Sequence, residues 1–582
     1  MSSLYDDVAL SGPDHVRLLN VAPSTEFDDP LICTLSVASL AEVNDNYVTL
    51  SYCWGSPDRG SPIQVNGVPY HITKELALAL RSIRAIENGQ PIWVDQLSIS
   101  QVDDQEKSQQ LLLMTQIFSG ASTCICYLGE DDGKVDQAIE YMEMALEEIK
   151  SLPTDHQRQT TLPPETSDLL YNAPGKAAFM SLANRRYFRR RWIVQETVLS
   201  QDPTGICGHR FFSMEAFFFV LAFTVTAESD RILRRPVSTN LDHHRFDEPP
   251  ALSHHYLRNQ FGQAARHFKP LLIFTTDADV TDVRDLFFAI HGLALDSDDF
   301  PNPDYSWDVG RTFREFTVGF VNQGFGLWCL QQAHRNCYPG MPSWVPDWRR
   351  ITRWPQLSLI PEPNFQSVMQ VDPDSKILEL SCLKLTKITQ CTFSSDVTGP
   401  TDAAAFSSQA LSSLELLFSK FTPDQTPEHV LKRLATVVIK FTHEHYSEDD
   451  TMLTCRVLAT AAYHQEHAAK AVEEKSTPFL LVKLVFERFQ VALTCSGLIC
   501  VAPFEVKEGD ELVLPEGGEA AIAVRHVEPG HHKYIGMAWV ENLSSRSDAR
   551  ADGGGDDDTD ASTVLQYPDE ENVKKYEKVL LV

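Results

Sequence analysis

Tyr47–Gly55, which reads YVTLSYCWG, decides the fold class of the N-terminal part of this 582-residue chain. The stretch begins as an apolar, β-branched run of strand length and stops at a glycine, so we expect a buried strand. In an open parallel sheet, the residues that leave the carboxyl end of a strand line the ligand crevice. Ser51, Tyr52, Trp54 and Gly55 are therefore candidate binding residues. The alternative is that the two aromatic side chains belong to the core and its rim.

Two more strands follow, each after a segment with helical periodicity. Residues 74–88 are expected to form a helix, and residues 91–95 (PIWVD) form the second strand. A further helix is expected over residues 105–119, and the third strand, residues 123–128 (TCICYL), ends at a glycine. This alternation implies right-handed crossovers and an α/β fold with a parallel, doubly wound sheet. Asp95 would then lie at a strand end next to the first strand.

A basic stretch lies farther along the chain. Five arginines occur within Arg185–Arg191, and an apolar helical segment with Trp192 and Glu196 follows them. These two residues are four apart, so on a helix they share one face. A carboxylate beside a large aromatic, next to a basic turn, indicates a functional site. The alternative is a structural helix in which Trp192 belongs to the core and Glu196 pairs with an arginine.

Composition limits the classes of function. The net charge of -30, from 80 acidic and 50 basic residues, argues against a broad nucleic-acid-binding face. The twelve cysteines show no spacing typical of a zinc site, so no metal is expected. The N-terminus lacks a secretory signal pattern, and no apolar run of about 18 residues occurs. We therefore expect a cytoplasmic protein without a membrane span.

Changes in composition and hydrophobic pattern along the sequence predict four parts. Residues 1–210 hold the strands and helices described above, together with two short strands in the first forty residues. Residues 211–350 are expected to be a helical extension, and residues 351–543 an α+β domain. Residues 544–582 are predicted to be a flexible acidic tail, because they are rich in Asp and Gly and poor in apolar side chains.

Three blocks of this sequence resemble, in order and spacing, the fungal heterokaryon-incompatibility (HET) domain. Ser51–Gly55 carries the S-Y-x-W-G motif of that family, Trp93–Asp95 carries W-I/V-D, and Phe188–Glu196 carries F-x-R-x-W-x-x-Q-E. Weaker features typical of the family follow at Asp282–Asp285, Pro303–Tyr305, Ser343–Trp348 and Gly509–Asp510. The resemblance thus extends over most of the chain, to about residue 543.

Two departures from the family pattern bear on mechanism. The family usually has Cys-Ile-Asn-Gln after the second block, where this chain has Ser98–Gln101, and Tyr187 replaces a usual tryptophan. The missing cysteine argues against thiol chemistry in that loop. The carboxylates of the blocks are intact.

The resemblance implies a role in signalling. HET-domain proteins look like triggers of programmed cell death when genetically different fungal cells fuse. The domain has been likened to Toll/interleukin-1-receptor (TIR) domains, which have a flavodoxin-like parallel sheet, and Leu50–Tyr52 is similar to the first strand of TIR domains. In TIR enzymes that cleave NAD, the catalytic glutamate follows a tryptophan by four residues, as Glu196 follows Trp192.

One hypothesis that follows is an NAD glycohydrolase, with NAD as substrate and no bound cofactor. Glu196 would be the catalytic carboxylate that stabilises an oxocarbenium-like ribose. Trp54 or Trp192 would stack on nicotinamide or adenine, Asp95 would position the ribose, and Arg189–Arg191 would hold the pyrophosphate. The substrate-binding candidates are Ser51, Tyr52, Trp54, Gly55, Asp95, Arg189, Arg190, Arg191 and Trp192.

The other hypothesis is a non-enzymatic interaction module. The domain would self-associate or bind another incompatibility protein, and the aromatic and arginine residues would form an interface hot spot. In that case Glu196→Gln would leave cell death intact. Under the enzymatic hypothesis the same substitution would abolish the release of nicotinamide.

Overall fold

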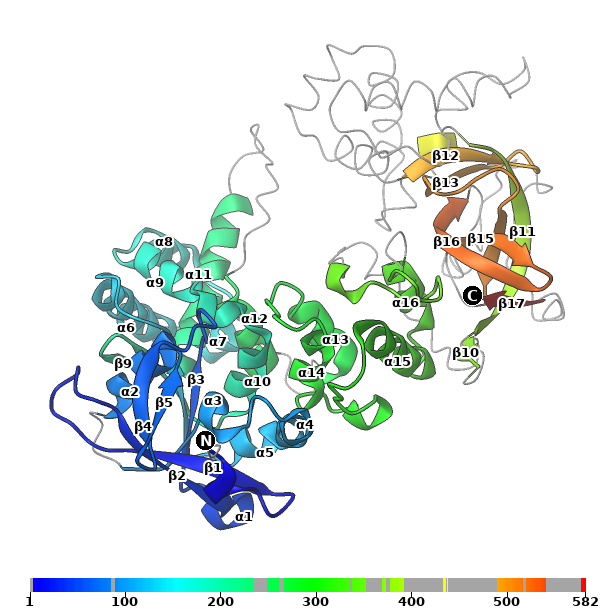
Figure 1. Cartoon of the computed structure of the whole chain (residues 1–582). Coiled ribbons are helices and arrows are strands. Elements are labelled where there is room, and N and C mark those ends of the chain that lie inside the picture. The colour runs from blue at the N-terminus through cyan, green and yellow to red at the C-terminus, as the bar shows by residue number, and fades with distance from the viewer. Residues whose placement is uncertain are drawn as a thin grey trace. The chain divides into compact units, whose positions relative to one another are not determined.

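A computed structural model describes residues 4–84, 89–233, 249–260, 266–333, 338–351, 369–372, 377–391, 433–435, 437, 489–516, 520–540 and 577–582. The chain divides into two compact units, which are described separately (Figure 1). Unit 1 comprises residues 1–236 and 245–309, and unit 2 comprises residues 237–244 and 310–582. Unit 1 thus continues well beyond residue 210. The predicted domain boundaries at 210, 350 and 543 remain predictions.

Unit 1 is built on a nine-stranded sheet in the order β5-β4-β2-β1-β6-β3-β7-β8-β9. The strands are β1 (His15–Val21), β2 (Ile32–Ser39), β3 (Val48–Tyr52), β4 (Ser61–Val65), β5 (Val68–Ile72), β6 (Ile92–Trp93), β7 (Thr123–Tyr127), β8 (Pro203–Cys207) and β9 (Arg210–Ser213).

The centre of this sheet is parallel, and its flanks contain antiparallel pairs together with one parallel pair, β2–β4. Strands β6, β3, β7 and β8 pair in parallel, and their spatial order is second, first, third and fourth along the chain. Antiparallel pairs join β1 to β2 and β6, β4 to β5, and β8 to β9. The α/β class is confirmed, but the sheet is mixed rather than wholly parallel. The connections within the β1–β2, β4–β5 and β8–β9 pairs are too short for a parallel crossover.

Helices cover both faces of the sheet, as the side-chain alternation along β7 requires. Cys124 and Cys126 pack into one core, with apolar side chains of α5 (Met114–Ser119), α6 (Val135–Ser151), α9 (Lys176–Ala183), α10 (Arg191–Leu199) and α11 (Met214–Leu233). Ile125 and Tyr127 pack into the other core, together with α2 (Lys74–Arg84). Strand β7 therefore has helices packed on both of its faces.

The remaining helices of unit 1 are short. They are η1 (Asp6–Val8), α1 (Leu40–Val43), α3 (Asp95–Ser98), α4 (Asp104–Leu112), α7 (Thr154–Gln159), α8 (Pro164–Asn172), η2 (Arg186–Arg189), α12 (Ala251–His255), η3 (Tyr256–Gln260), α13 (Phe268–Phe274), α14 (Asp285–His291) and η5 (Ser297–Asp299). The helix predicted over 105–119 is two helices that meet at Leu113. The second predicted strand is shorter than expected, because Asp95 already begins α3.

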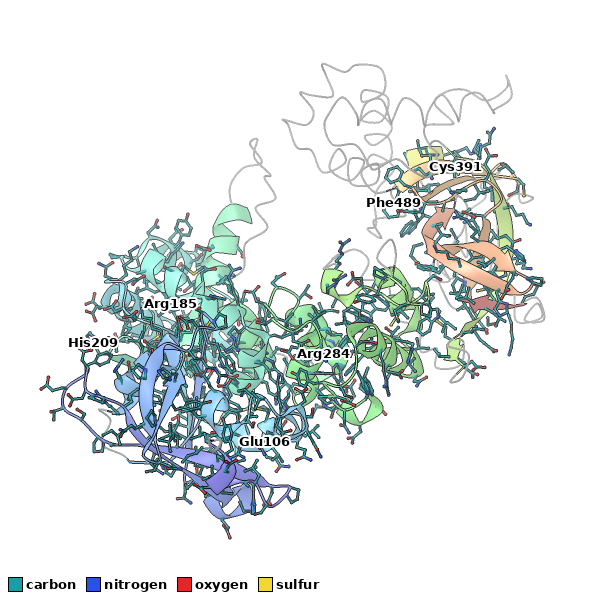
Figure 2. All side chains as sticks on the ribbon, in the orientation of Figure 1. Glu106, Arg185, His209, Arg284, Cys391 and Phe489 are labelled. Atoms are coloured by element: carbon teal, nitrogen blue, oxygen red, sulfur yellow. The ribbon has the colours of Figure 1, made fainter. Side chains whose placement is uncertain are left out.

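Unit 2 combines helices with an antiparallel, barrel-like sheet. Its elements are α15 (Val309–Asn322), α16 (Gly326–Ala333), η6 (Trp348–Arg350), β10 (Met369–Val371), β11 (Leu378–Cys391), β12 (Phe489–Thr494), β13 (Ile499–Pro503), β14 (Glu511–Pro515), β15 (Ala521–Glu528), β16 (His531–Val540) and β17 (Glu577–Leu581). The long strand β11, which ends at Cys391 beside β12 (Figure 2), pairs with both β12 and β14. These pairings close the circuit β11-β12-β13-β16-β15-β14, and irregular positions in β11 let it bend.

The last residues of the chain belong to this sheet, contrary to the expected flexible tail. Strand β17 pairs antiparallel with β11 and parallel with β16, and it buries Val579 and Leu581. The N–H and the hydroxyl of Ser343 both donate to the carbonyl of Val582, at 3.0 and 2.5 Å. The alternation of apolar residues explains the strand. Residues 544–576 of the predicted tail lie outside the described residues.

Candidate functional site

The site begins where two parallel strands end. β3 ends at Tyr52, and Asp95 follows its neighbour β6 as the first residue of α3. The indole N–H of Trp54 donates to Asp95 Oδ2 at 2.7 Å, which joins the loop after β3 to the loop after β6. The predicted proximity of these strand-end residues is therefore present in the structure.

Asp95 is fixed in place and partly exposed. The N–H of Gln96 donates to Asp95 Oδ1 at 2.7 Å, so each carboxylate oxygen accepts a hydrogen bond. Its deep position raises the pKa of Asp95, while the charge of Arg190 and these hydrogen bonds oppose the rise. The hydroxyl of Tyr52 lies close by and has no hydrogen bond of standard geometry among the described residues.

Glu196 comes to the same place from helix α10. Its side chain is 7% exposed and faces Ser51, Arg190 and Asp95. Burial raises its pKa from 4.5 to about 7; Arg190 lowers it, Asp95 raises it, and a hydrogen bond with Ser51 lowers it. At neutral pH the carboxyl group is thus present in both protonation states. A group of this kind can accept or donate a proton, which is what general acid–base work requires.

Arg190 is the positive partner of both carboxylates. It stands just before α10, and its Nη1 donates to the carbonyl of Tyr52 at 2.8 Å. The guanidinium lowers the pKa of Asp95 and of Glu196. Two acids and one arginine leave the cluster with a net negative charge when both acids are ionised. Their mutual repulsion is the reason why Asp95 raises the pKa of Glu196.

A buried hydrogen-bond chain continues from Glu196 into the core. The hydroxyls of Ser51 and Tyr187 lie 2.7 Å apart, and both side chains are buried. Tyr187 also lies beside the thiol of Cys126, whose pKa is raised by burial. Sequence reasoning did not select Tyr187 as a site residue. The available signal was its departure from the family pattern, since a tryptophan at this place could not accept a hydrogen bond.

The three consecutive arginines lie in three different surroundings. Arg189 is exposed, and Arg190 joins the carboxylates. Arg191 is fully buried, and its guanidinium nitrogens have no hydrogen-bond partner in the described part of the chain. Burial lowers its pKa to about 9, against the influence of nearby Asp285. The structure therefore does not bring the three side chains together as one anion cradle.

Trp192 and Glu196 also serve different places. The indole of Trp192 lies close to Asp285 at the start of α14 and lowers the pKa of that carboxyl, whereas Glu196 faces Ser51 and Arg190. The i, i+4 spacing on a helix is confirmed, since both lie in α10. Their side chains nevertheless diverge, and Trp192 packs at the edge of the core.

Gly55 has a structural reason for its place in the first block. Its φ is +67°, and a Cβ atom there would lie 2.1 Å from Cδ of Glu75. A glycine is required both by the left-handed backbone and by the close approach of this carboxylate. Gly55 thus brings the loop after β3 against the start of α2.

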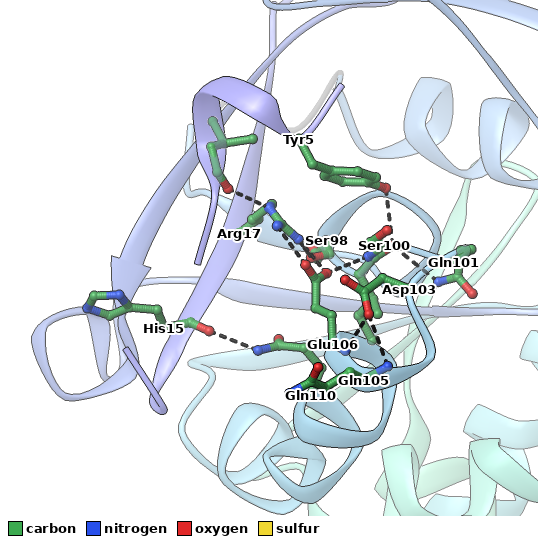
Figure 3. Close-up of polar contacts among 12 residues, drawn as sticks. Tyr5, His15, Arg17, Ser98, Ser100, Gln101, Asp103, Gln105, Glu106 and Gln110 are labelled. Atoms are coloured by element: carbon green, nitrogen blue, oxygen red, sulfur yellow. Dashed lines mark hydrogen bonds and ion pairs between the residues drawn. The ribbon is translucent and has the colours of Figure 1, made fainter. Parts of the chain in front are cut away.

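The second block owes part of its pattern to structure rather than to the site. Both guanidinium Nη atoms of Arg17 donate to the two Glu106 oxygens, at 2.7 and 2.9 Å, and the N–H of Ser100 donates to Glu106 Oε1 (Figure 3). Ser98, where the family has cysteine, accepts from the N–H of Val94 through its hydroxyl at 3.1 Å. These bonds fix the loop that carries Asp95.

Two further features, a metal site and a membrane-spanning helix, are absent from the described residues. No group of three or more His, Cys, Asp or Glu side chains there is arranged to hold a metal ion. None of the helices that the structure describes has the length and apolar character needed to cross a bilayer.

Comparison with known proteins identifies a family that part of the chain matches. Residues 47–196 match the family described as heterokaryon incompatibility protein (HET). The chain is also similar to heterokaryon incompatibility protein 6, OR allele, of Neurospora crassa, with 26% identity over 403 residues. That alignment covers 59% of this chain and 59% of the Neurospora protein. No solved structure matches the chain.

The matched stretch begins just before β3 and ends at Glu196, so it contains every residue of the cluster around Asp95, Arg190 and Glu196. Both ends of the match thus coincide with the elements that build the site. The match to the heterokaryon-incompatibility (HET) family, over residues 47–196, therefore contains the whole candidate site.

Proposed function

We propose that this chain is a fungal heterokaryon-incompatibility protein that triggers cell death through its HET domain. The observation that carries the proposal is the meeting of all three sequence blocks at one place: Trp54 contacts Asp95, and Arg190 and Glu196 face both. The similarity to a Neurospora incompatibility protein supports the same role. Because the alignment spans 59% of that relative, the activity of the whole chain rests on this proposal.

The proposal includes a place of action and a kind of partner. The protein would act in the cytoplasm, where the contents of fused cells mix. It would respond by self-association or by contact with another incompatibility protein. The half-buried Arg190, flanked by acids, suits a site whose charge balance changes when a partner or ligand arrives.

The test is expression of the full chain in a filamentous fungus from an inducible promoter, with colony growth and vital staining as readouts. Cells that express the wild-type chain should die, and cells that express Arg190→Gln at the same protein level should survive. Arg189→Gln is the matched control, because Arg189 is exposed and the same charge is removed one residue away. Survival with the wild-type chain in compatible and incompatible hosts alike would rule out the proposal.

The surroundings of Glu196 favour a second candidate function, cleavage of NAD. The parallel strands β6, β3, β7 and β8 follow the order 2-1-3-4, which supports a flavodoxin-like and hence TIR-like centre for the sheet. Glu196, in the helix beside β3 and β7, is a buried carboxyl with a pKa of about 7. Such a carboxyl suits the stabilisation of an oxocarbenium-like ribose in a site with little water.

In this reaction the bond between nicotinamide nitrogen and ribose C1′ breaks, and nicotinamide leaves with the bonding electron pair. Water adds to C1′, and the products are nicotinamide, ADP-ribose and one proton. Glu196 would stabilise the positive charge on the ribose, and Asp95 would orient its hydroxyls. Trp192 is engaged with Asp285, so a base would stack on Trp54 instead.

Incubation of the full chain with NAD should release nicotinamide, measured by chromatography. Glu196→Gln should abolish the release, while Glu130→Gln, a change at an exposed carboxylate, should not. If the wild-type chain kills cells and Glu196→Gln kills equally, the domain acts as an interaction module without this chemistry.

A further inference from the structure

The backbone of the segment before α14 forms hydrogen bonds with the residues on both sides of Arg190. The N–H of Asp279 donates to the carbonyl of Arg189, and the N–H of Arg191 donates to the carbonyl of Asp279 at 3.2 Å. These bonds form a parallel bridge between Arg190 and Asp279. Residue 279 lies outside the stretch 47–196 that matches the HET family. The backbone at Arg190 is therefore held by a later part of unit 1.

Asp285 holds the first turn of α10 from the same side. Its buried carboxylate accepts from the hydroxyl of Tyr305 at 2.5 Å and lies close enough to the Trp192 indole for that group to lower the pKa of Asp285. Arg191 lies near enough for its charge to interact with Asp285. The two residues that follow Arg190 are thus both engaged by one carboxylate.

Tyr305 is itself restrained by two cations. Lys107 Nζ lies 4.1 Å from the centre of its ring, and Arg284 Cζ lies 4.9 Å from it. Arg284 also donates to the Tyr305 carbonyl at 2.5 Å and pairs with both oxygens of Asp282. A ring in contact with two cations, on a backbone that is itself hydrogen-bonded, has little freedom to move. Arg284 is labelled in Figure 2.

We propose that Asp285 and Tyr305 are positioning residues: together they fix the first turn of α10 and so hold Arg190 beside Asp95 and Glu196. This assigns a shared role to the 282–285 and 303–305 motifs, which the candidate site does not include. It rests on the proposed function only in treating the cluster of Arg190 and Glu196 as the functional site.

A displacement of one residue at the start of α10 is passed along the backbone to its neighbours. Arg190 and Trp192 are two residues apart, so a shift of Trp192 by an ångström moves Arg190 by a similar distance. The influence of Arg190 on Glu196 falls with distance, and a misplaced guanidinium no longer favours the ionised carboxylate. The groups that face Glu196 from its packed neighbours are Arg190, Asp95, Ser51, Tyr52, Tyr187 and Cys126.

The test is hydrogen–deuterium exchange of the α10 amides in the full chain, between pH 5 and 9, after correction for the intrinsic exchange rate. In the wild type, the opening constant should rise from about pH 4.5 to about pH 7 and then level off. The rise occurs because Glu196 ionises near its ordinary pKa of 4.5 when α10 is open and near 7 when it is closed.

Tyr305→Phe removes one oxygen atom and the hydrogen bond to Asp285. The rise of the opening constant should then continue past pH 7 and level off at a pH at least about half a unit higher. This displacement corresponds to a threefold increase in the proton affinity of Glu196. Trp192→Phe, which removes the indole close to Asp285, should give the same displacement. Glu196→Gln should remove the rise between pH 4.5 and pH 7.

The matched control is Tyr141→Phe, a buried tyrosine of unit 1 whose hydroxyl bonds to Thr224 and Leu170. It should raise the opening constant equally at all pH values. If Tyr305→Phe behaves like this control, Tyr305 has a structural role only and the inference is wrong. The readout needs neither cell death nor NAD cleavage, so its failure and that of the proposed function are separate results.

Discussion

The indole nitrogen of Trp54 lies 2.7 Å from Asp95 Oδ2, and this bond joins two sequence blocks that are 41 residues apart in the chain. The bond is made possible by the parallel pairing of β3 and β6, which brings the loops after both strands to one edge. The first block, which contains Trp54, and the second block, which contains Asp95, are therefore both needed to form this one contact.

Trp54→Phe should weaken unit 1 because it removes the donor to Asp95. The loss of a hydrogen bond to a buried carboxylate costs roughly 1–3 kcal/mol, and the pKa of Asp95 should rise further above its ordinary value, since the Trp54 bond lowers it. Thermal unfolding followed by calorimetry should show a lower Tm for one transition. An unchanged Tm would mean that this bond contributes nothing to stability.

Glu196→Gln should stabilise unit 1 at alkaline pH. The pKa of Glu196 is raised from 4.5 to about 7 in the folded state, so its contribution is full below pH 4.5 and is lost as pH rises to 7. The substitution should therefore be neutral at pH 4.5 and stabilising by about 1–3 kcal/mol at pH 8. Chemical unfolding at both pH values tests this, and a variant that is less stable at pH 8 would contradict it.

Acid should destabilise unit 1 through three buried histidines. The pKa values of His254, His255 and His291 are lowered by burial from 6.5 to about 4, so stability is lost as pH falls from 6.5 to 4. Each contributes up to roughly 3 kcal/mol. His254→Gln should lower the proton uptake on unfolding by about one at pH 5.

The stability that Gly55→Ala loses should be restored in part by a second substitution. The alanine costs about 1–2 kcal/mol for its left-handed backbone, and its Cβ meets the Glu75 carboxylate. Glu75→Ala on the same chain removes the collision and leaves the backbone cost. The double variant should therefore have a higher Tm than Gly55→Ala alone, and strict additivity of the two losses would show that the collision is unimportant.

Asp510→Asn should destabilise unit 2 and leave unit 1 unchanged. Asp510 is 3% exposed and accepts two hydrogen bonds from Arg525 and one from the N–H of Lys507, all at 2.8 Å. Loss of the charge should cost about 1–3 kcal/mol. Glu508→Gln, in the same loop but exposed, should cost less than about 0.5 kcal/mol. Calorimetry distinguishes the transitions, and equal effects would refute the assignment.

Local pattern was sufficient to predict the parallel strands β3, β6 and β7 and the approach of Asp95 to the residues after β3, but not the fourth parallel strand, β8. It also selected Glu196, because a carboxylate within an apolar helix is rarely placed there without a partner. The mixed sheet was not predicted, since the pattern of β1 and β2 specifies strands but not their direction.

The arginines and Trp192 show what local pattern cannot give. Arg189, Arg190 and Arg191 are neighbours in the sequence, but Arg189 ends η2, Arg190 has an extended backbone and Arg191 begins α10, so their side chains diverge. Trp192 is drawn to Asp285, a residue 93 positions later in the chain. Tyr187 is placed by its 2.7 Å contact with Ser51, which only the three-dimensional packing creates.

The pairing of β11 with β17 has a consequence for synthesis on the ribosome. β11 ends at residue 391, whereas β17 begins at residue 577, so this sheet cannot be completed until almost the whole chain has been translated. Unit 1 ends at residue 309 and can fold earlier. At about 5–20 residues per second, the remaining 270 or so residues take roughly 15–50 s to synthesise. During that interval every nascent chain carries a finished HET domain ahead of an unfinished C-terminal sheet.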